Sequence, residues 1–132
     1  MSLFDYVEFL DLARSLIGRT PGGSTDEAAW RSAVSRAYYA AYHVALDYAV
    51  SKALPPAVLP PGNKAGAHER LIRQYLQNFP KTDPGFAVGS ELSDLKGRRV
   101  RADYRSPQVT KAHAITAARQ ADALIVQIRS LP

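Results

Sequence analysis

Residues 32–43 read Ser32-Ala-Val-Ser-Arg-Ala-Tyr-Tyr-Ala-Ala-Tyr-His43, and they lie in a helix-length run without Gly or Pro from Ser24 to Leu54. The run is apolar on nearly all sides, which is typical of a central, buried helix. A polar stripe interrupts it, because residues three or four positions apart share a helix face. The stripe consists of Ser32, Arg36, Tyr39, His43 and Asp47. An arginine, a tyrosine and a histidine on one face of a central helix indicate a role beyond packing.

Further helices are predicted around this one from apolar periodicity and from turn and capping residues. The sequence Ser24-Thr-Asp-Glu27 is a capping box that opens the central helix, and Pro55-Pro56 ends it. Ser106-Pro107 is expected to cap the last helix. The other helices are expected over 3–17, 64–78, 86–104 and from 107 to nearly 130. Nothing alternates as a strand does, so we expect an all-α, mostly antiparallel bundle of four or five helices that forms a single domain over residues 1–132.

The composition excludes several classes of site. The 132 residues contain no cysteine, so disulfides and thiolate chemistry are absent. Three scattered histidines without an acidic cluster provide no set of metal ligands of usual spacing, and no cofactor motif is present. The N-terminal residues lack the basic region of a signal peptide, and no apolar run approaches the length of a membrane span. A cytoplasmic protein without a membrane partner is expected.

Positive charge is concentrated near the end of the fourth predicted helix. The formal net charge is +5, and five basic residues lie within ten positions: Lys96, Arg98, Arg99, Arg101 and Arg105. Arg99 falls on the apolar, inward stripe of this helix, with Asp103 one turn further on. The pair either fixes the helix end or leaves Arg99 as an anion ligand in a cleft between helices. The outward basic residues form either a solvated face or a surface for nucleic acid.

The histidines are open to two interpretations each. His43 is either a core histidine that bonds Asp47 at i+4, or part of a functional stripe. His68 lies near the start of the third predicted helix, on the same face as Leu71, Ile72 and Tyr75. It is either a capping or core hydrogen-bonding residue, or a site residue.

Two motifs together resemble the HEPN superfamily of small helical bundles. The first is Ser35-Arg-Ala-Tyr-Tyr-Ala-Ala-Tyr-His43 on the central helix, followed by His68 at the start of the next. The second is Arg99-Val-Arg-Ala-Asp-Tyr104 at the end of the fourth. The order of the elements also agrees, so the resemblance covers residues 3 to 130.

The resemblance implies a homodimer with a composite cleft at the two-fold axis, acting in a prokaryotic stress or defence system such as a toxin–antitoxin pair. Many members of the superfamily are metal-independent endoribonucleases, whereas others bind nucleotides or act as non-catalytic partners. Some members are modified on a tyrosine near the late motif by a nucleotidyltransferase-type partner protein. Tyr104 lies one position from that place.

This sequence departs from the active members, which carry R-x(4–6)-H late in the bundle. Asp103 occupies the position of the histidine, and no histidine follows before His113. If the protein cleaves RNA, Arg99 would stabilise phosphate charge and His43 would transfer the proton, with Asp103 and Tyr39 orienting them. Without cleavage, the same cleft would bind RNA or a nucleotide, or would be an internal polar network. The residues assigned to RNA or nucleotide binding are Arg36, Tyr39, His68, Arg98, Arg101 and Tyr104.

Overall fold

A computed structural model describes residues 5–19, 26–105 and 108–132, the side chains of Arg19 and Arg105 excepted. Within this part of the chain every regular element is helical, which confirms the all-α prediction. The helices are α1 (Glu8–Arg19), α2 (Asp26–Ser51), α3 (Ala67–Asn78), α4 (Pro84–Val100) and α5 (Lys111–Arg129). A π-helical turn, η1 (Arg101–Arg105), directly continues α4.

The central helix α2 packs against α1 and α5 along most of its length and also against α4. Its buried face is rich in alanine, and the facing side of α5 buries four more alanines. Small side chains let helix axes approach closely, because the interaxial distance depends on the residues at the contact. The α5 residues of this seam are Ala114, Ala117, Ala118 and Ala121. The alanine pattern of the sequence thus explains why α2 lies inside the bundle.

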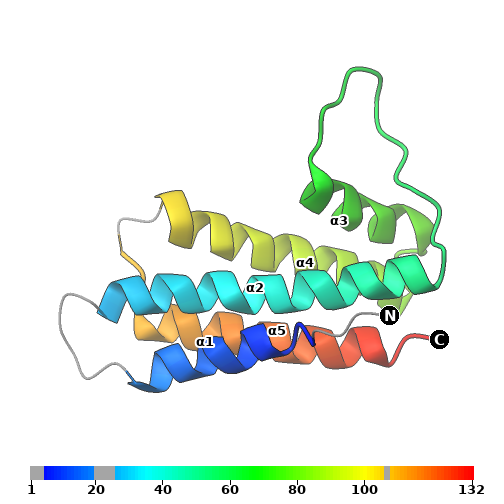
Figure 1. The fold of residues 1–132 in the computed structure, drawn as a ribbon. Helices are drawn as coiled ribbons and strands as arrows, with labels where there is room; N and C mark the ends of the chain where they lie inside the picture. Colours follow the sequence, from blue (N-terminus) through cyan, green and yellow to red (C-terminus); the bar gives the residue numbers. More distant parts are fainter. Residues whose placement is uncertain (1–4, 20–25, 106–107) are drawn as a thin grey trace.

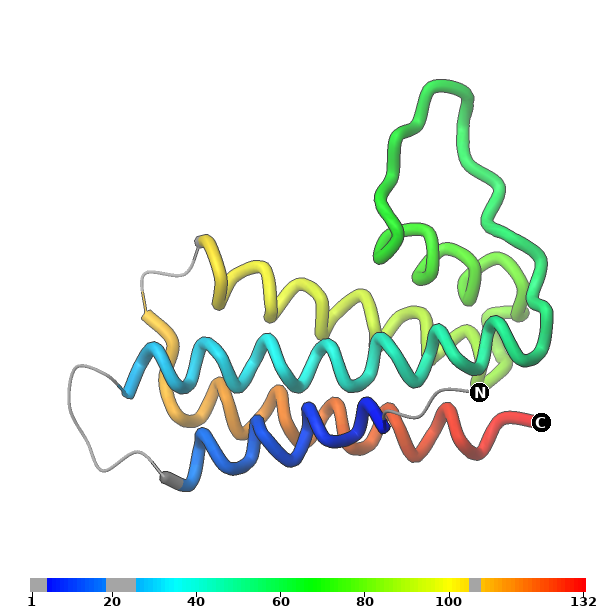
Figure 2. The backbone as a smooth tube through the Cα atoms, viewed as in Figure 1, coloured from blue at the N-terminus to red at the C-terminus, as the bar shows by residue number. Residues whose placement is uncertain are grey.

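The chain path gives α3 an unusual direction (Figures 1 and 2). α1, α2, α4 and α5 alternate in direction, whereas α3 runs the same way as α2. The Pro-rich segment after α2 projects from the bundle and leads the chain back, so that α3 can run in the same direction as α2. Side-chain amides of α3 hold this segment: Gln74 donates to the carbonyl of Leu54, and Gln77 bonds both backbone groups of Val58. α3 packs mainly on α4.

Several helix starts differ from the sequence predictions. Within the described residues α1 begins at Glu8 rather than at residue 3, and α3 begins at Ala67 rather than at residue 64. α4 begins at Pro84, where Asp83 caps it by accepting a 2.8 Å hydrogen bond from the Gly85 amide. The last helix begins at Lys111 rather than at residue 107, because Thr110 is its cap and forms a reciprocal capping box with His113. The predicted caps at Ser24 and at Ser106-Pro107 lie outside the described residues.

Candidate functional site

The guanidinium of Arg99 lies on two tyrosine rings of the central helix. Its side chain is 17% exposed, and its Cζ atom is 5.7 Å from the ring centroid of Tyr38 and 5.1 Å from that of Tyr39. A cation over an aromatic face is attracted by the ring quadrupole, and partial burial strengthens the attraction. Arg99 therefore points inward, as its place on the apolar stripe of α4 predicts.

The predicted pair of Arg99 and Asp103 is present, with 3.2 Å between Nε and Oδ2. The buried Nε nevertheless has no hydrogen-bond partner, so this approach lacks the geometry of a hydrogen bond. The contact is therefore an ion pair without a hydrogen bond. No hydrogen bond to the Arg99 guanidinium occurs within the described residues, although its Nε is shielded from solvent.

His68, at the start of α3, is fixed by the central helix. The hydroxyl oxygen of Tyr38 lies 2.6 Å from Nδ1 of His68, and Tyr38 is fully buried. Burial raises the pKa of Tyr38 well above its ordinary value of 10, so the hydroxyl keeps its proton. His68 is its only hydrogen-bond partner among the described residues, so Tyr38 must donate to Nδ1. The ring proton of neutral His68 therefore resides on Nε2.

Both histidines of this face favour the neutral form. Burial lowers the pKa of His68 below 6.5, and the nearby positive charges of Arg99 and Lys96 and the neighbouring His43 lower it further. Burial also lowers the pKa of His43, although Asp47 opposes this effect. At neutral pH the positive charge of the site is thus carried by arginine and lysine.

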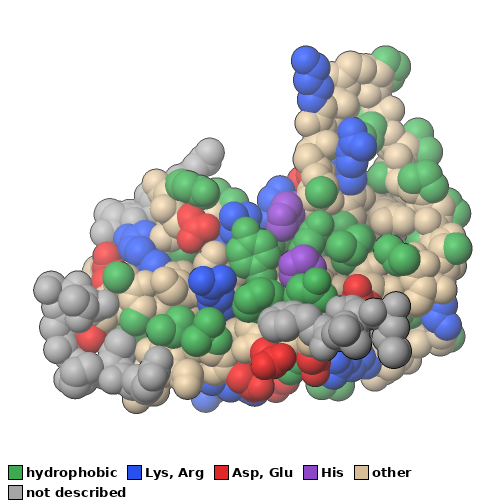
Figure 3. Space-filling model, in the orientation of Figure 1, with side chains coloured by type: hydrophobic (Ala, Val, Ile, Leu, Met, Phe, Trp, Pro, Cys, Tyr) green, Lys and Arg blue, Asp and Glu red, His purple; other side chains and the backbone are tan. Residues whose placement is uncertain are grey.

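Aromatic rings join the two histidines into one surface. The His68 ring stacks on Tyr42 with centroids 4.1 Å apart, and the His43 ring stacks on Tyr6 at 4.0 Å. Tyr42 also meets His43 edge-on at 5.0 Å. Figure 3 shows two histidine side chains side by side within a hydrophobic area of one face, with basic side chains next to them. We call this surface the aromatic face; its members are Tyr6, Phe9, Tyr38, Tyr39, Tyr42, His43 and His68.

The stripe predicted on α2 borders this face and is not an internal network. Ser32, Arg36 and Asp47 are exposed, and Tyr39 and His43 are half-buried. Arg36 lies 5.8 Å above the Phe9 ring. Arg36 and Asp103 line one groove between α2 and η1, whereas Arg99, Tyr39 and His43 are not among its described lining residues. No hydrogen bond joins His43 to Asp47 in the part of the chain that is described.

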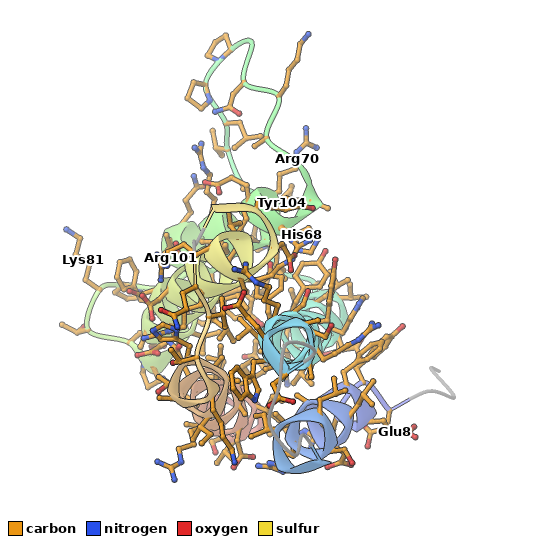
Figure 4. All side chains as sticks on the ribbon, turned by 90° about the vertical axis from the view of Figure 1, so that its left-hand side faces the viewer. Glu8, His68, Arg70, Lys81, Arg101 and Tyr104 are labelled. Carbon is orange, nitrogen blue, oxygen red and sulfur yellow. The ribbon has the colours of Figure 1, made fainter. Side chains whose placement is uncertain are left out.

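Three predicted residues lie elsewhere. Arg98 bonds Gln120 of α5 at 3.0 Å and pairs with Asp94, so it points away from the aromatic face. Arg101 lines a separate cavity with Arg98. Tyr104 of η1 is 76% exposed. Figure 4 shows Tyr104 on the same side as His68 of α3, and Arg101 on the other side.

Sequence reasoning missed four aromatic members of the face. Tyr38 and Tyr42 were part of the quoted motif, and their i,i+4 spacing placed them on one side of α2. Tyr6 and Phe9 have an i,i+3 spacing near the N-terminus, but nothing in the sequence linked that segment to His43.

Comparisons with protein-family models, curated proteins and solved structures find no match to this chain. The resemblance to the HEPN superfamily therefore stays a prediction from the two sequence motifs. None of the described helices is long and apolar enough to cross a membrane. The described residues also contain no cluster of three His, Asp or Glu side chains that could hold a metal ion.

Proposed function

We propose that this protein is an HEPN-like bundle that binds RNA or a nucleotide on the aromatic face. The observation that carries the proposal is the placement of Arg99, which lies over Tyr38 and Tyr39 while its donors remain free of hydrogen bonds among the described residues. A guanidinium held in this way is pre-organised for a phosphate, because its fork of donors matches two phosphate oxygens. Asp103 neutralises the charge of Arg99 when no ligand is bound.

The neighbouring rings suit the bases of the same ligand. Tyr39 lies against Arg99, the His43 ring is 6.3 Å from that of Tyr39, and Tyr6 stacks on His43, and all three are half-buried. Stacking of bases on aromatic side chains contributes about 1–3 kcal/mol per base and tolerates any base. Phosphate contact and stacking together predict binding of single-stranded RNA or of a nucleotide with little sequence preference.

Binding is better supported than cleavage. A ribonuclease needs a group that takes the proton from the 2′-hydroxyl. His68 already uses Nδ1 to accept the Tyr38 hydrogen bond and carries a proton on Nε2, so it acts as a donor. His43 would have to be the base, and no described side chain bonds it in a way that fixes its tautomer.

An incubation of the pure protein in EDTA with a structured RNA that contains single-stranded loops tests both activities. A gel shift that is lost in Arg99→Gln and kept in Lys81→Gln would support binding. Lys81 is an exposed cation of the turn before α4, so the control removes the same charge at the other end of that helix. RNA fragments that depend on Arg99 and His43 would show that the protein is an endoribonuclease rather than a binding protein. Absence of any Arg99-dependent shift would reject the proposal.

A second candidate function is a non-catalytic module that pairs with a nucleotidyltransferase-type protein. One observation favours it: the side chain of Tyr104 is exposed, and its hydroxyl makes no hydrogen bond among the described residues. Incubation with such a partner and ATP, followed by mass spectrometry, would show addition of a nucleotide to Tyr104. Identical labelling of Tyr104→Phe would reject this assignment.

We also retain the homodimer as part of the proposal. Sedimentation equilibrium gives its mass directly, and a monomer at high protein concentration would remove the composite cleft from the account. The aromatic face itself is formed by one chain, so binding to Arg99 and the dimer can fail separately.

A further inference from the structure

A cavity at the junction of α2, α4, η1 and α5 lies apart from the aromatic face. It is lined by Val34, Arg98, Arg101, Ala102, Val109 and His113 and has a volume of about 130 Å³. Its floor is apolar and its polar lining is basic. Arg98 reaches it from the side of α4 that contacts Gln120 of α5, whereas Arg99 contacts α2. The two neighbouring arginines therefore serve different sites.

The lining side chains of this cavity present donors without acceptors. Arg98 uses Nε to bond Gln120, which leaves both of its terminal nitrogens without a hydrogen bond among the described residues. The side chain of Arg101 makes no hydrogen bond or ion pair among the described residues, and only its backbone amide is bonded, to α4 carbonyls. The amide of Thr110 donates to Nδ1 of His113 at 3.0 Å, so the ring proton of neutral His113 resides on Nε2. Three groups of donors therefore border one cavity that is partly open to solvent.

The charge balance of the cavity favours an anion. No carboxylate is among the described lining residues. Asp94 lies 3.5 Å from Arg98 and neutralises part of its charge. Glu27 accepts from the Val109 amide and pairs with Arg31, so its charge is already used. Arg101 has no carboxylate partner among the described residues, and the apolar part of the lining comes from Val34, Ala102 and Val109.

We propose that this cavity binds a phosphate-sized oxyanion, held by the guanidinium groups of Arg98 and Arg101 and by the Nε2 proton of His113. The ligand is either free phosphate or a phosphate group of a larger molecule, since both present the same tetrahedral oxygens. The N-terminus of α5 adds a favourable dipole, because Thr110 and Lys111 begin that helix beside the cavity. This site does not depend on the aromatic face.

Amide NMR titrations of the whole protein test the proposal with two probes, inorganic phosphate and a dinucleoside monophosphate, against sodium chloride of equal ionic strength. We expect saturable shifts at Ala102, Thr110 and His113. Saturation by inorganic phosphate but not by the dinucleoside monophosphate would identify free phosphate as the ligand. Saturation by both probes would identify the phosphate group of a larger molecule as a ligand too. Arg101→Gln should weaken the affinity about tenfold, since a charge-assisted hydrogen bond is lost. Lys81→Gln should not change it. Non-saturating shifts with both probes, or equal affinity in Arg101→Gln, would overturn the proposal.

Discussion

The hydroxyl of Tyr38 on α2 donates a 2.6 Å hydrogen bond to Nδ1 of His68 on α3. This bond links the central helix to the one helix that the Pro-rich segment carries away from the bundle axis. It also fixes the tautomer of neutral His68, because the ring proton then lies on Nε2 and can be donated to a ligand. The geometry of the proposed site thus depends on a buried contact between residues 30 positions apart.

Removal of the Tyr38 hydroxyl should destabilise the protein. Tyr38→Phe leaves Nδ1 of His68 without its donor, and loss of a buried hydrogen bond of this kind costs about 1 kcal/mol. Urea denaturation measures the free energy of unfolding. Tyr104→Phe is the matched control, because that hydroxyl is exposed and has no described partner, and it should change the stability by less than about 0.5 kcal/mol. Equal stability of Tyr38→Phe and the parent would show that the bond is not formed.

The stability should fall as the pH drops below 6.5. The pKa values of His43 and His68 are lowered in the folded protein, so below their ordinary value of 6.5 the unfolded chain binds more protons than the folded one. Acid therefore stabilises the unfolded state, and the loss is complete once the pH is below both folded pKa values. Protonated His68 would also lose the acceptor for Tyr38. His68→Gln should reduce the slope of unfolding free energy against pH between 5 and 7, and a further His43→Gln should reduce it again.

An unchanged slope in the double variant would mean that other groups cause the pH dependence. The pKa of Glu69 is lowered by its hydrogen bonds to Arg73 and Lys96, which outweigh its burial. Its stabilising contribution is present above its ordinary value of 4.5 and is lost below that value. The two effects thus occupy different pH ranges and can be separated in one titration series.

Two glycines of α4 should respond to alanine with opposite signs. A Cβ on Gly85 would lie 2.4 Å from the ring of Phe79, so Gly85→Ala forces the ring to move and should cost about 1–3 kcal/mol. A Cβ on Gly97 would have Arg101 as its nearest neighbour at 3.7 Å, an ordinary contact. Gly97→Ala should stabilise the helix by about 1 kcal/mol. Thermal unfolding measures both; stabilisation by Gly85→Ala would contradict the packing of α3 on α4.

Asp103 should compete with a phosphate for Arg99. Asp103→Asn removes the carboxylate 3.2 Å from Nε and should strengthen RNA binding severalfold, because Arg99 then keeps its full charge. Asp122→Asn is the control: it removes an equal charge on α5 from a pair with Arg14 of α1. Fluorescence anisotropy with a short labelled RNA measures the change. Weaker binding in Asp103→Asn would mean that the carboxylate positions Arg99 rather than competing with the ligand.

Much of the architecture was predictable because it is local. The central helix follows from a long run without Gly or Pro, and the Arg99–Asp103 pair follows from i+4 spacing. The start of α5 was not predicted, because Thr110-x-x-His113 forms a capping box with histidine in place of Glu or Gln. The sequence predicts η1 as a continuation of α4, because nothing in its residues distinguishes a π-turn from an α-helix.

The composition of the site was only partly predictable. The polar stripe of α2 named Tyr39 and His43, but their partners come from tertiary contacts. Tyr6 contacts His43 from the N-terminal segment. His68 contacts Tyr38 because the segment after residue 51 leads the chain back before α3 begins. The apolar stripe separates inward Arg99 from its outward basic neighbours in sequence, but it does not predict the partners that hold each arginine. Gln120 of α5 holds Arg98 on one side of α4, and the tyrosines of α2 hold Arg99 on the other.

The central claim is that Arg99 contacts the phosphate of a bound RNA. The most direct test is the dissociation constant for a short single-stranded RNA, measured over a range of salt concentrations. Each phosphate contact contributes about 0.7 to the slope of the logarithm of affinity against the logarithm of salt for a single strand. The account predicts that Arg99→Gln binds at least about tenfold more weakly and loses about one such contact from the slope, whereas Lys81→Gln keeps both values. An affinity and a slope that are the same in Arg99→Gln and in the parent protein would contradict it.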